Sequence, residues 1–285
     1  MISDITLGQF FPGFSPIHKL DPRTKIILTA LFIVLVFIAN NPISFALLTV
    51  LVLAVIQASR ISFTIVLKGI KPIVAVLVIT ALINMFMTGG DGQLLVDFWI
   101  IKIYISGIVR AVFMALRVII LIMGTSIFLT YTTSPIALTD GLESLLSPLK
   151  KIGVPVHTFA MMMSIALRFI PTLIEETEKI MNAQKSRGAD FSSGSLMKRA
   201  KALIPLLVPL FVSSFKRAEE LATAMECRCY RGDNNRTKLV KLEMKPRDYL
   251  WITGALVIIA AMVCISILPY RGELSPIGNV FFYKI

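Results

Sequence analysis

The sequence predicts an all-α integral membrane protein with about five transmembrane helices and a cytoplasmic module of three amphipathic helices. Its 285 residues are 56% hydrophobic and only 16% charged, whereas charged residues make up about a quarter of an average soluble domain. Several apolar runs approach or reach the length of about 20 residues that a helix needs to cross a bilayer. Two further long runs are apolar on one face and charged on the other, which is typical of amphipathic helices.

The predicted spans follow one another with short breaks. Asp21 and Pro22 provide a helix cap and a first-turn residue, so the first span begins there. The first two spans are short for a bilayer, so flanking Lys and Arg side chains must reach the interface by snorkelling. Asp97 and Lys102 interrupt residues 94–105, which favours a short extracytoplasmic hairpin or re-entrant piece there. The spans cover residues 26–39, 43–58, 70–87, 107–131 and 249–268.

Two arginines lie inside the fourth span. Arg110 and Arg117 are seven residues apart and therefore share one face of the helix. Charged side chains at that depth normally face protein or water, so both are functional candidates. For Arg110 the simpler interpretation, that it lies at the interface and snorkels, is favoured.

The charge distribution predicts the orientation of the chain. Residues 131–248 contain 18 Lys and Arg against 12 Asp and Glu, whereas residues 88–106 have two Asp against one Lys. By the positive-inside rule, the N-terminus and the central region are cytoplasmic. The net charge of +12 does not indicate a nucleic-acid partner, because the basic residues are dispersed between apolar runs and form no basic face with exposed aromatic residues.

Two of the three helices of the predicted cytoplasmic module end in a similar way. The helices are expected from Pro135 to about residue 149, over 157–187 and over 195–230. The second ends in AQKSRG, with Arg187 as the fifth residue of that string, and the third in AMECRCYRG, with Arg228 as the fifth. Each arginine lies seven residues after a member of an apolar stripe and so continues it. Gly188 and Gly232 follow as helix breakers.

Two interpretations of these arginines are open. A basic residue in the last turn favours the helix dipole and can bond the final carbonyls, which contributes about 0.3–1 kcal/mol. Alternatively, a lone cation at the end of an apolar face docks into a partner protein. The repetition of the pattern at the ends of both helices favours docking.

These endings resemble the coupling region of the transmembrane T-component of energy-coupling factor (ECF) transporters, the vitamin and trace-metal importers of prokaryotes. That family carries two arginine motifs, usually with Ala or Gly beside the arginine. Ser186-Arg187-Gly188 is close to this form, whereas Cys227-Arg228-Cys229 departs from it. Further matches span most of the chain in family order: HKLDPRTK from His18 to Lys25, TTSP from Thr132 to Pro135 and LRFIPTLIEE from Leu167 to Glu176.

The resemblance implies a transmembrane coupling subunit of an ECF-type ABC importer in a prokaryotic cytoplasmic (inner) membrane, surrounded by lipid. Such a subunit transmits ATP-driven motion of two cytoplasmic ABC-type ATPase subunits to a separate substrate-binding membrane S-component, which captures the vitamin or trace metal.

The organisation expected is a transmembrane bundle (1–131) with about four spans, a cytoplasmic coupling-helix module (132–248), and a final transmembrane helix with its tail (249–285). We expect the S-component on the apolar halves of the second and third module helices, at Met162, Leu207 and Phe211. The resemblance assigns ATPase binding to Ala183, Ser186, Arg187, Gly188, Ala224, Cys227, Arg228 and Cys229.

No catalytic residue, cofactor or metal site is predicted. The sequence lacks the Gly-x-x-x-x-Gly-Lys-Ser/Thr string that cradles phosphates, so ATP hydrolysis is left to the partner ATPases. His18 and His157 are far apart in sequence, and two cysteines at i and i+2 on a helix point away from each other, so zinc binding is not expected. Three cysteines, an odd count, indicate no disulfide framework, and the first residues do not form a cleavable signal peptide.

Other membrane classes fit the pattern less well. An intramembrane hydrolase requires a nucleophile and a base, and neither Gly-x-Ser-x-Gly nor paired intramembrane carboxylates occur. If the chain were a secondary transporter, inverted repeats or a pair of discontinuous helices would be expected, and the spans do not display them. The main alternative is the permease subunit of a conventional binding-protein-dependent ABC importer, which predicts one short coupling loop instead of two long amphipathic helices with terminal arginines.

Overall fold

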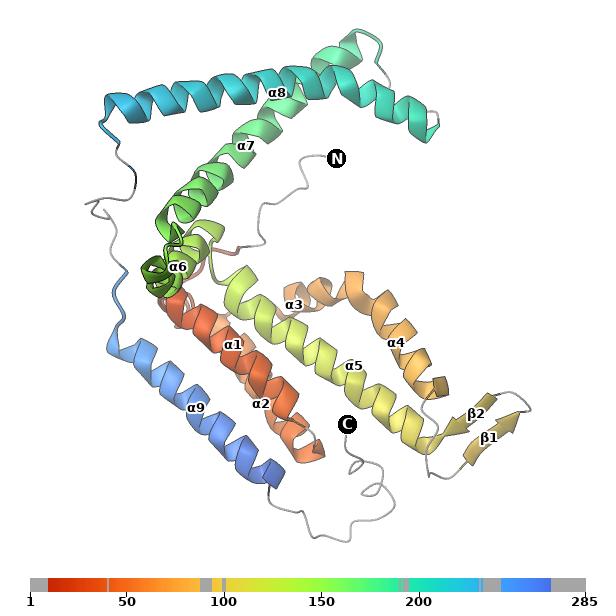
Figure 1. Ribbon diagram of the computed structural model, residues 1–285. Coiled ribbons are helices and arrows are strands. Elements are labelled where there is room, and N and C mark those ends of the chain that lie inside the picture. The colour runs from red at the N-terminus through yellow and green to blue at the C-terminus, as the bar shows by residue number, and fades with distance from the viewer. Residues whose placement is uncertain are drawn as a thin grey trace. The chain divides into compact units, whose positions relative to one another are not determined.

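The computed structural model describes residues 10–39, 41–87, 94–98, 101–189, 191, 195–230, 232 and 242–267. The chain divides into two units (Figure 1). We call the first the bundle, formed by Gln9–Ser134 with Leu242–Ile285, and the second the module, which contains Pro135–Lys241.

The described part of the bundle consists of helices and one short hairpin. Strands β1 (Leu94–Phe98) and β2 (Ile101–Tyr104) pair antiparallel, with Asp97 opposite Lys102, which confirms the predicted hairpin. The helices are α1 (Pro22–Ile38), α2 (Pro42–Ser59), α3 (Phe63–Ile70), α4 (Val74–Met87), α5 (Ile105–Thr125) and α9 (Pro246–Ile267). A 3₁₀ turn, η1 (Lys71–Ile73), joins α3 to α4, and a π-helical turn, η2 (Ser126–Tyr131), continues α5.

Helix α1 is the centre of the bundle and packs against α5, η2 and α9 (Figure 1). Its start is the predicted one: Pro22 is the first helical residue, and the Asp21 carboxylate accepts a hydrogen bond from the Arg23 amide at 2.9 Å. Phe32 is buried against Phe128, with ring centroids 6.4 Å apart. A Cβ on Gly124 would come within 2.2 Å of the Phe32 ring, so α5 approaches α1 closely because residue 124 has no side chain.

The two arginines of α5 differ in their surroundings. The Arg117 Nη2 donates a hydrogen bond to the Ala39 carbonyl at 2.7 Å, and its guanidinium lies 5.5 Å from the centre of the Phe45 ring. Ala39 is the C-cap of α1, so Arg117 binds a carbonyl at the end of that helix. Arg110 is exposed, as its snorkelling interpretation requires. Arg117 therefore has a structural role at the C-terminal end of α1.

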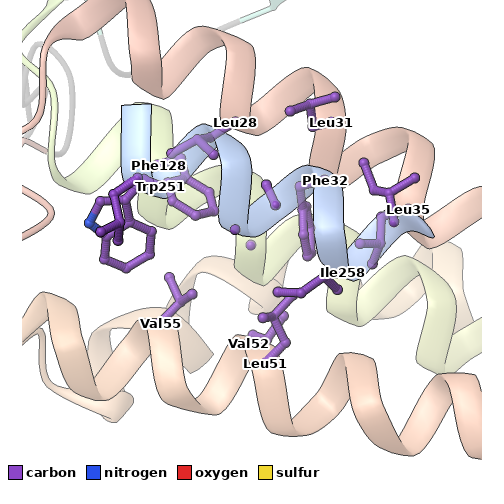
Figure 2. Close-up of a pocket in the computed structure, with 15 residues that line it drawn as sticks. Leu28, Leu31, Phe32, Leu35, Leu51, Val52, Val55, Phe128, Trp251 and Ile258 are labelled. Carbon is purple, nitrogen blue, oxygen red and sulfur yellow. The ribbon is translucent and has the colours of Figure 1, made fainter. Parts of the chain in front are cut away.

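The bundle contains an apolar cavity of about 270 Å³ (Figure 2). Side chains of α1, α2, η2 and α9 line it, among them Phe32, Val55, Phe128, Trp251 and Ile258. No charged side chain contributes to this lining. The described residues that line it include no carboxylate, imidazole or thiol that could bind a metal ion.

In the part of the module that the structure describes there are three helices and one short 3₁₀ turn. They are α6 (Pro135–Leu146), α7 (Val156–Ser186) and α8 (Leu196–Cys227), and η3 (Ser147–Ile152) follows α6. The His157 Nδ1 lies 2.8 Å from the Glu143 Oε1, which ties the start of α7 to α6. Helix α8 crosses α7 (Figure 1). Both long helices continue through their prolines, Pro171 in α7 and Pro205 and Pro209 in α8.

The all-α membrane fold is confirmed, with a different set of long apolar helices. Among the described residues, five helices are long and apolar enough to cross a membrane: Pro42–Ser59, Phe63–Met85, Gly107–Tyr131, Val156–Ser186 and Pro246–Ile265. The third span thus begins earlier than predicted, because the helix runs on through the 3₁₀ turn at Pro72. Helix α1 has only 17 residues and is absent from this set, whereas α7, predicted to be cytoplasmic, is present. The C-terminal part of α7, from Glu175 on, also carries Glu176, Glu178, Lys179 and Lys185, so only its first part has the composition of a span.

Candidate functional site

The C-terminus of α7 has a closed pattern of backbone hydrogen bonds. Arg187 is the C-cap, and Gly188 adopts the left-handed conformation with φ +85°. The Gly188 amide donates to the Lys185 carbonyl at 2.9 Å, and the Ala189 amide donates to the Gln184 carbonyl at 3.0 Å. This pair of bonds is the Schellman motif, in which the last carbonyls of a helix are satisfied by the backbone that follows. Gly188 has the role predicted for it.

The C-terminus of α8 repeats the motif with another residue in the left-handed position. Arg228 is the C-cap, and Cys229 has φ +55°. The Cys229 amide donates to the Glu226 carbonyl at 2.9 Å, and the Tyr230 amide to the Met225 carbonyl at 3.0 Å. Gly232 was therefore the wrong choice of helix breaker: its φ is +75°, but the last helical residue is Cys227, five residues earlier. The prediction failed because a cysteine occupies a conformation that usually selects Gly or Asn.

Both arginine side chains are exposed, and within the described residues neither guanidinium forms a hydrogen bond or an ion pair. The backbone amides that follow already satisfy the carbonyls at both helix ends. The arginine side chains therefore do not bond the last carbonyls of their helices. Of the capping interpretation, only the favourable interaction with the helix dipole is left. The residues predicted around them are exposed as well: Ala183, Ser186, Gly188, Ala224, Cys227 and Cys229.

A polar contact marks the crossing of α7 and α8. The Arg217 Nη2 lies 2.8 Å from the Glu176 Oε2, and the Ser213 hydroxyl donates to the other carboxylate oxygen. The apolar spacing within each helix would place Glu176 and Arg217 opposite the apolar stripe, facing solvent, but in the structure both lie at the crossing. The inner face of α8 instead contains the buried Leu206 and the half-buried Leu210, Ser213, Arg217 and Leu221. The pattern misled because a polar contact substitutes for an apolar one at the crossing.

The crossing lies at the same distance along the chain from each arginine. Arg187 follows Glu176 by 11 residues, and Arg228 follows Arg217 by 11 residues. At 1.5 Å per residue, each arm is about 16 Å long. Eleven residues also complete about three helical turns, so each arginine leaves its helix on nearly the same side as the crossing residue. The Glu176–Arg217 contact is therefore the common starting point of two arms of equal length that each end in an exposed cation.

The predicted apolar surface is exposed on both long helices. Met162 of α7 is 49% exposed, and Leu207 and Phe211 of α8 are 56% and 64% exposed. The aromatic ring of Phe215, which the sequence interpretation did not single out, lies with its centroid 4.8 Å from that of Phe211. Four exposed residues of α8, spaced by three or four positions, form a continuous apolar stripe on one face of the helix: Ile204, Val208, Phe211 and Phe215.

The fold and this surface define a helical, multi-pass membrane protein with an additional amphipathic unit. The model of the cobalt transport protein family, CbiQ, matches residues 13–239. The chain is 54% identical over 268 residues to the energy-coupling factor transporter transmembrane protein EcfT of Clostridium kluyveri. The matched region covers 94% of this chain and 97% of the relative. The chain is also 48% identical over 263 residues to the EcfT protein of Bacillus subtilis, with 92% and 98% covered. The chain belongs to this family of transmembrane components of energy-coupling factor transporters.

The comparisons confirm the family that the arginine motifs and the three further strings indicated. The family match includes both arginine ends, α6, α7, α8 and the bundle helices up to α5. The relatives are named as transmembrane proteins of a transporter.

Proposed function

We propose that the chain couples two cytoplasmic ATPases to a substrate-binding S-component for the uptake of a vitamin or a trace metal ion. In this proposal one ATPase docks on the Arg187 end of α7 and the other on the Arg228 end of α8. The ATPases hydrolyse ATP, and this chain transmits their motion. The N-terminus and the module are cytoplasmic.

The observation that carries the proposal is the pair of equivalent, exposed arginine ends. A guanidinium presents a fixed fork of donors that matches a carboxylate in a bidentate geometry. The neighbouring side chains are small, namely Ser186 and Gly188 on α7 and Cys227 and Cys229 on α8, so a groove of the partner can close around each arginine. Two equal arms suit a pair of similar partners.

The exposed apolar stripe of α8 and the Met-rich start of α7 support the position of the S-component. Large apolar side chains exposed side by side mark contact with protein or membrane. Methionine is unbranched and polarisable, so a surface that includes Met162 and Met163 can adapt to more than one partner.

Purification from the native membrane tests the proposal directly. The tagged chain is isolated in mild detergent, and its co-purifying subunits are identified and tested for ATP hydrolysis. We expect two ATPase subunits and a small membrane protein for each chain, with hydrolysis that disappears when the ATPases are stripped off. ATP turnover by a chain proven free of ATPases, or isolation of the chain without any ATPase, would contradict the proposal.

Labelling tests the orientation. In a chain whose three cysteines are replaced with serine, Lys198→Cys should react with a membrane-impermeant maleimide only after the cells are opened. Asp91→Cys, in a segment outside the described residues, should react in intact cells. Reaction of Lys198→Cys in intact cells would place the module outside and refute the proposed coupling.

A further inference from the structure

A buried polar cluster joins three segments of the bundle that are far apart in sequence. Lys25, in the first turn of α1, is 2% exposed, and its Nζ donates to the Thr132 carbonyl at 2.7 Å and to the His18 carbonyl at 3.3 Å. Asp248, in the first turn of α9, is 1% exposed. Its two carboxylate oxygens accept from the amides of Asp21 at 2.9 Å and Lys245 at 2.8 Å.

Both charged side chains of this cluster end on backbone atoms. A buried charge is costly unless hydrogen bonds compensate for lost water, and here the compensating groups are main-chain carbonyls and amides. Such contacts fix the path of the main chain, because they cannot be kept if the backbone of Thr132 or Lys245 moves away. The cluster also brings together residues of the HKLDPRTK and TTSP strings, which take no part in the proposed docking contacts.

The backbone held by the cluster is the backbone that leads into and out of the module. The chain passes from bundle to module between Ser134 and Pro135 and returns between Lys241 and Leu242. Thr132 precedes the first passage by two residues, and Lys245 follows the second by three. Lys25 holds the outgoing chain, and Asp248 holds the returning chain against Asp21. Since Asp21 and Lys25 both lie at the start of α1, one helix end secures both connections.

We propose that this cluster, which we call the anchor, is the point through which movement of the module reaches the bundle. This inference rests on the proposed coupling function. Lys25 and Asp248 are then positioning residues: they touch neither ATP nor substrate, and they hold the backbone of both connections against the start of α1. Without the anchor this backbone is no longer held, so the ATPases and the module still move while the bundle does not follow.

The experiment uses the complex as it is purified from the native membrane, with a reporter in the bundle. Cys264 of α9 is exposed, so it is labelled with an environment-sensitive fluorophore after Cys227 and Cys229 are replaced with serine. Lys25→Met removes the donor to Thr132, and Asp248→Asn keeps the shape but loses one of two acceptors. We expect each variant to keep ATP hydrolysis within twofold and to lose the ATP-dependent fluorescence change at Cys264 by at least tenfold.

Thr29→Val is the matched control. Thr29 is also buried in α1, and its hydroxyl donates to the Lys25 carbonyl at 2.7 Å within the same helix. The variant removes a buried hydrogen bond of the same helix without releasing a connection to the module. The fluorescence change per ATP hydrolysed should stay within twofold of the unmodified complex, whereas a general destabilisation of α1 would lower it.

An insertion tests the anchor with all of its side chains in place. Gly-Ser-Gly-Ser between Thr133 and Ser134 lengthens the outgoing connection, and the same insertion between Ile61 and Ser62, directly before α3, lengthens a loop within the bundle. We expect the first insertion to abolish the fluorescence change and the second to leave it within twofold. A full fluorescence change with the first insertion, or no ATP-dependent change in the unmodified complex, would overturn the proposed role of the anchor. If the unmodified chain retained no ATPases, the proposed function itself would fail.

Discussion

The two long helices of the module, α7 and α8, end with the same hydrogen bonds but with different residues. Each has an arginine as its C-cap, an arm of 11 residues from the crossing, and a Schellman motif. The left-handed position is Gly188 in α7 and Cys229 in α8. Because the distance from the crossing to the arginine is preserved while the terminating residue is not, the position of the arginine is the shared feature. The predictions below test how far this equivalence extends.

The largest effect is expected from reversing the charge of either arginine. If each guanidinium pairs with a buried acidic group, removal of one partner costs about 3–5 kcal/mol, or more than 100-fold in affinity. Arg187→Glu and Arg228→Glu should each abolish retention of one ATPase, and the double variant should retain none. Lys at either position should restore retention only in part, since it lacks the fork geometry. The measurement is the ATPase stoichiometry of the purified complex.

Lys185→Glu and Lys216→Glu are the matched controls, since both lysines are exposed on the same two helices. They should leave the stoichiometry unchanged. Normal stoichiometry with Arg187→Glu or Arg228→Glu would return that arginine to a dipole-capping role, with a contribution of under about 1 kcal/mol.

A smaller effect is expected from charges on the apolar faces, where α8 exposes more large apolar side chains than α7. Phe211→Glu, alone or with Leu207→Glu, should reduce retention of the S-component at least tenfold, because a desolvated carboxylate replaces an aromatic contact. Met162→Glu on α7 should reduce it less. The test is the yield of the small membrane subunit per chain, and loss of the ATPases instead would reverse the assignment of the two surfaces.

A still smaller, few-fold effect is expected at the crossing of α7 and α8. Glu176→Arg or Arg217→Glu alone places like charges in contact and should lower retention of both ATPases together, because both arms depend on one contact. The double variant restores opposite charges and should recover retention to within twofold. Loss of only one ATPase in a single variant would show that the arms are positioned independently.

The smallest effect on assembly is expected from exchanging the residues of the left-handed position. A residue other than glycine in that conformation costs about 1–2 kcal/mol. Gly188→Ala should therefore destabilise the last turn of α7, and Cys229→Gly should stabilise the last turn of α8 by a similar amount. A Cβ on Gly188 meets no atom within 4 Å, so packing does not obscure the comparison. Hydrogen exchange of the terminal amides measures both effects, and equal protection in the unmodified chain and in both variants would contradict the prediction.

The helix positions of the module could be predicted because hydrophobic periodicity and capping are local. The helices predicted over 157–187 and 195–230 are Val156–Ser186 and Leu196–Cys227 in the structure. The faces of these helices were harder to predict, since Glu176 and Arg217 look like solvent-facing charges in their own helices. Only their contact across the crossing makes them part of the interface between α7 and α8. The docking roles of Arg187 and Arg228 stay predictions for the experiments above.

The sequence by itself determined that the chain is a helical membrane protein, where most helices begin and end, and which family its strings resemble. These properties follow from residue type and from spacings of a few residues, through side-chain hydrophobicity and backbone capping. Only the tertiary structure decided what the polar groups inside the bundle do. Arg117 binds the end of a helix 78 residues away, and Asp248 binds the amide of Asp21 across 227 residues. Such pairs arise because a buried charge must find a partner wherever the fold brings one within reach, and no local pattern encodes that distance.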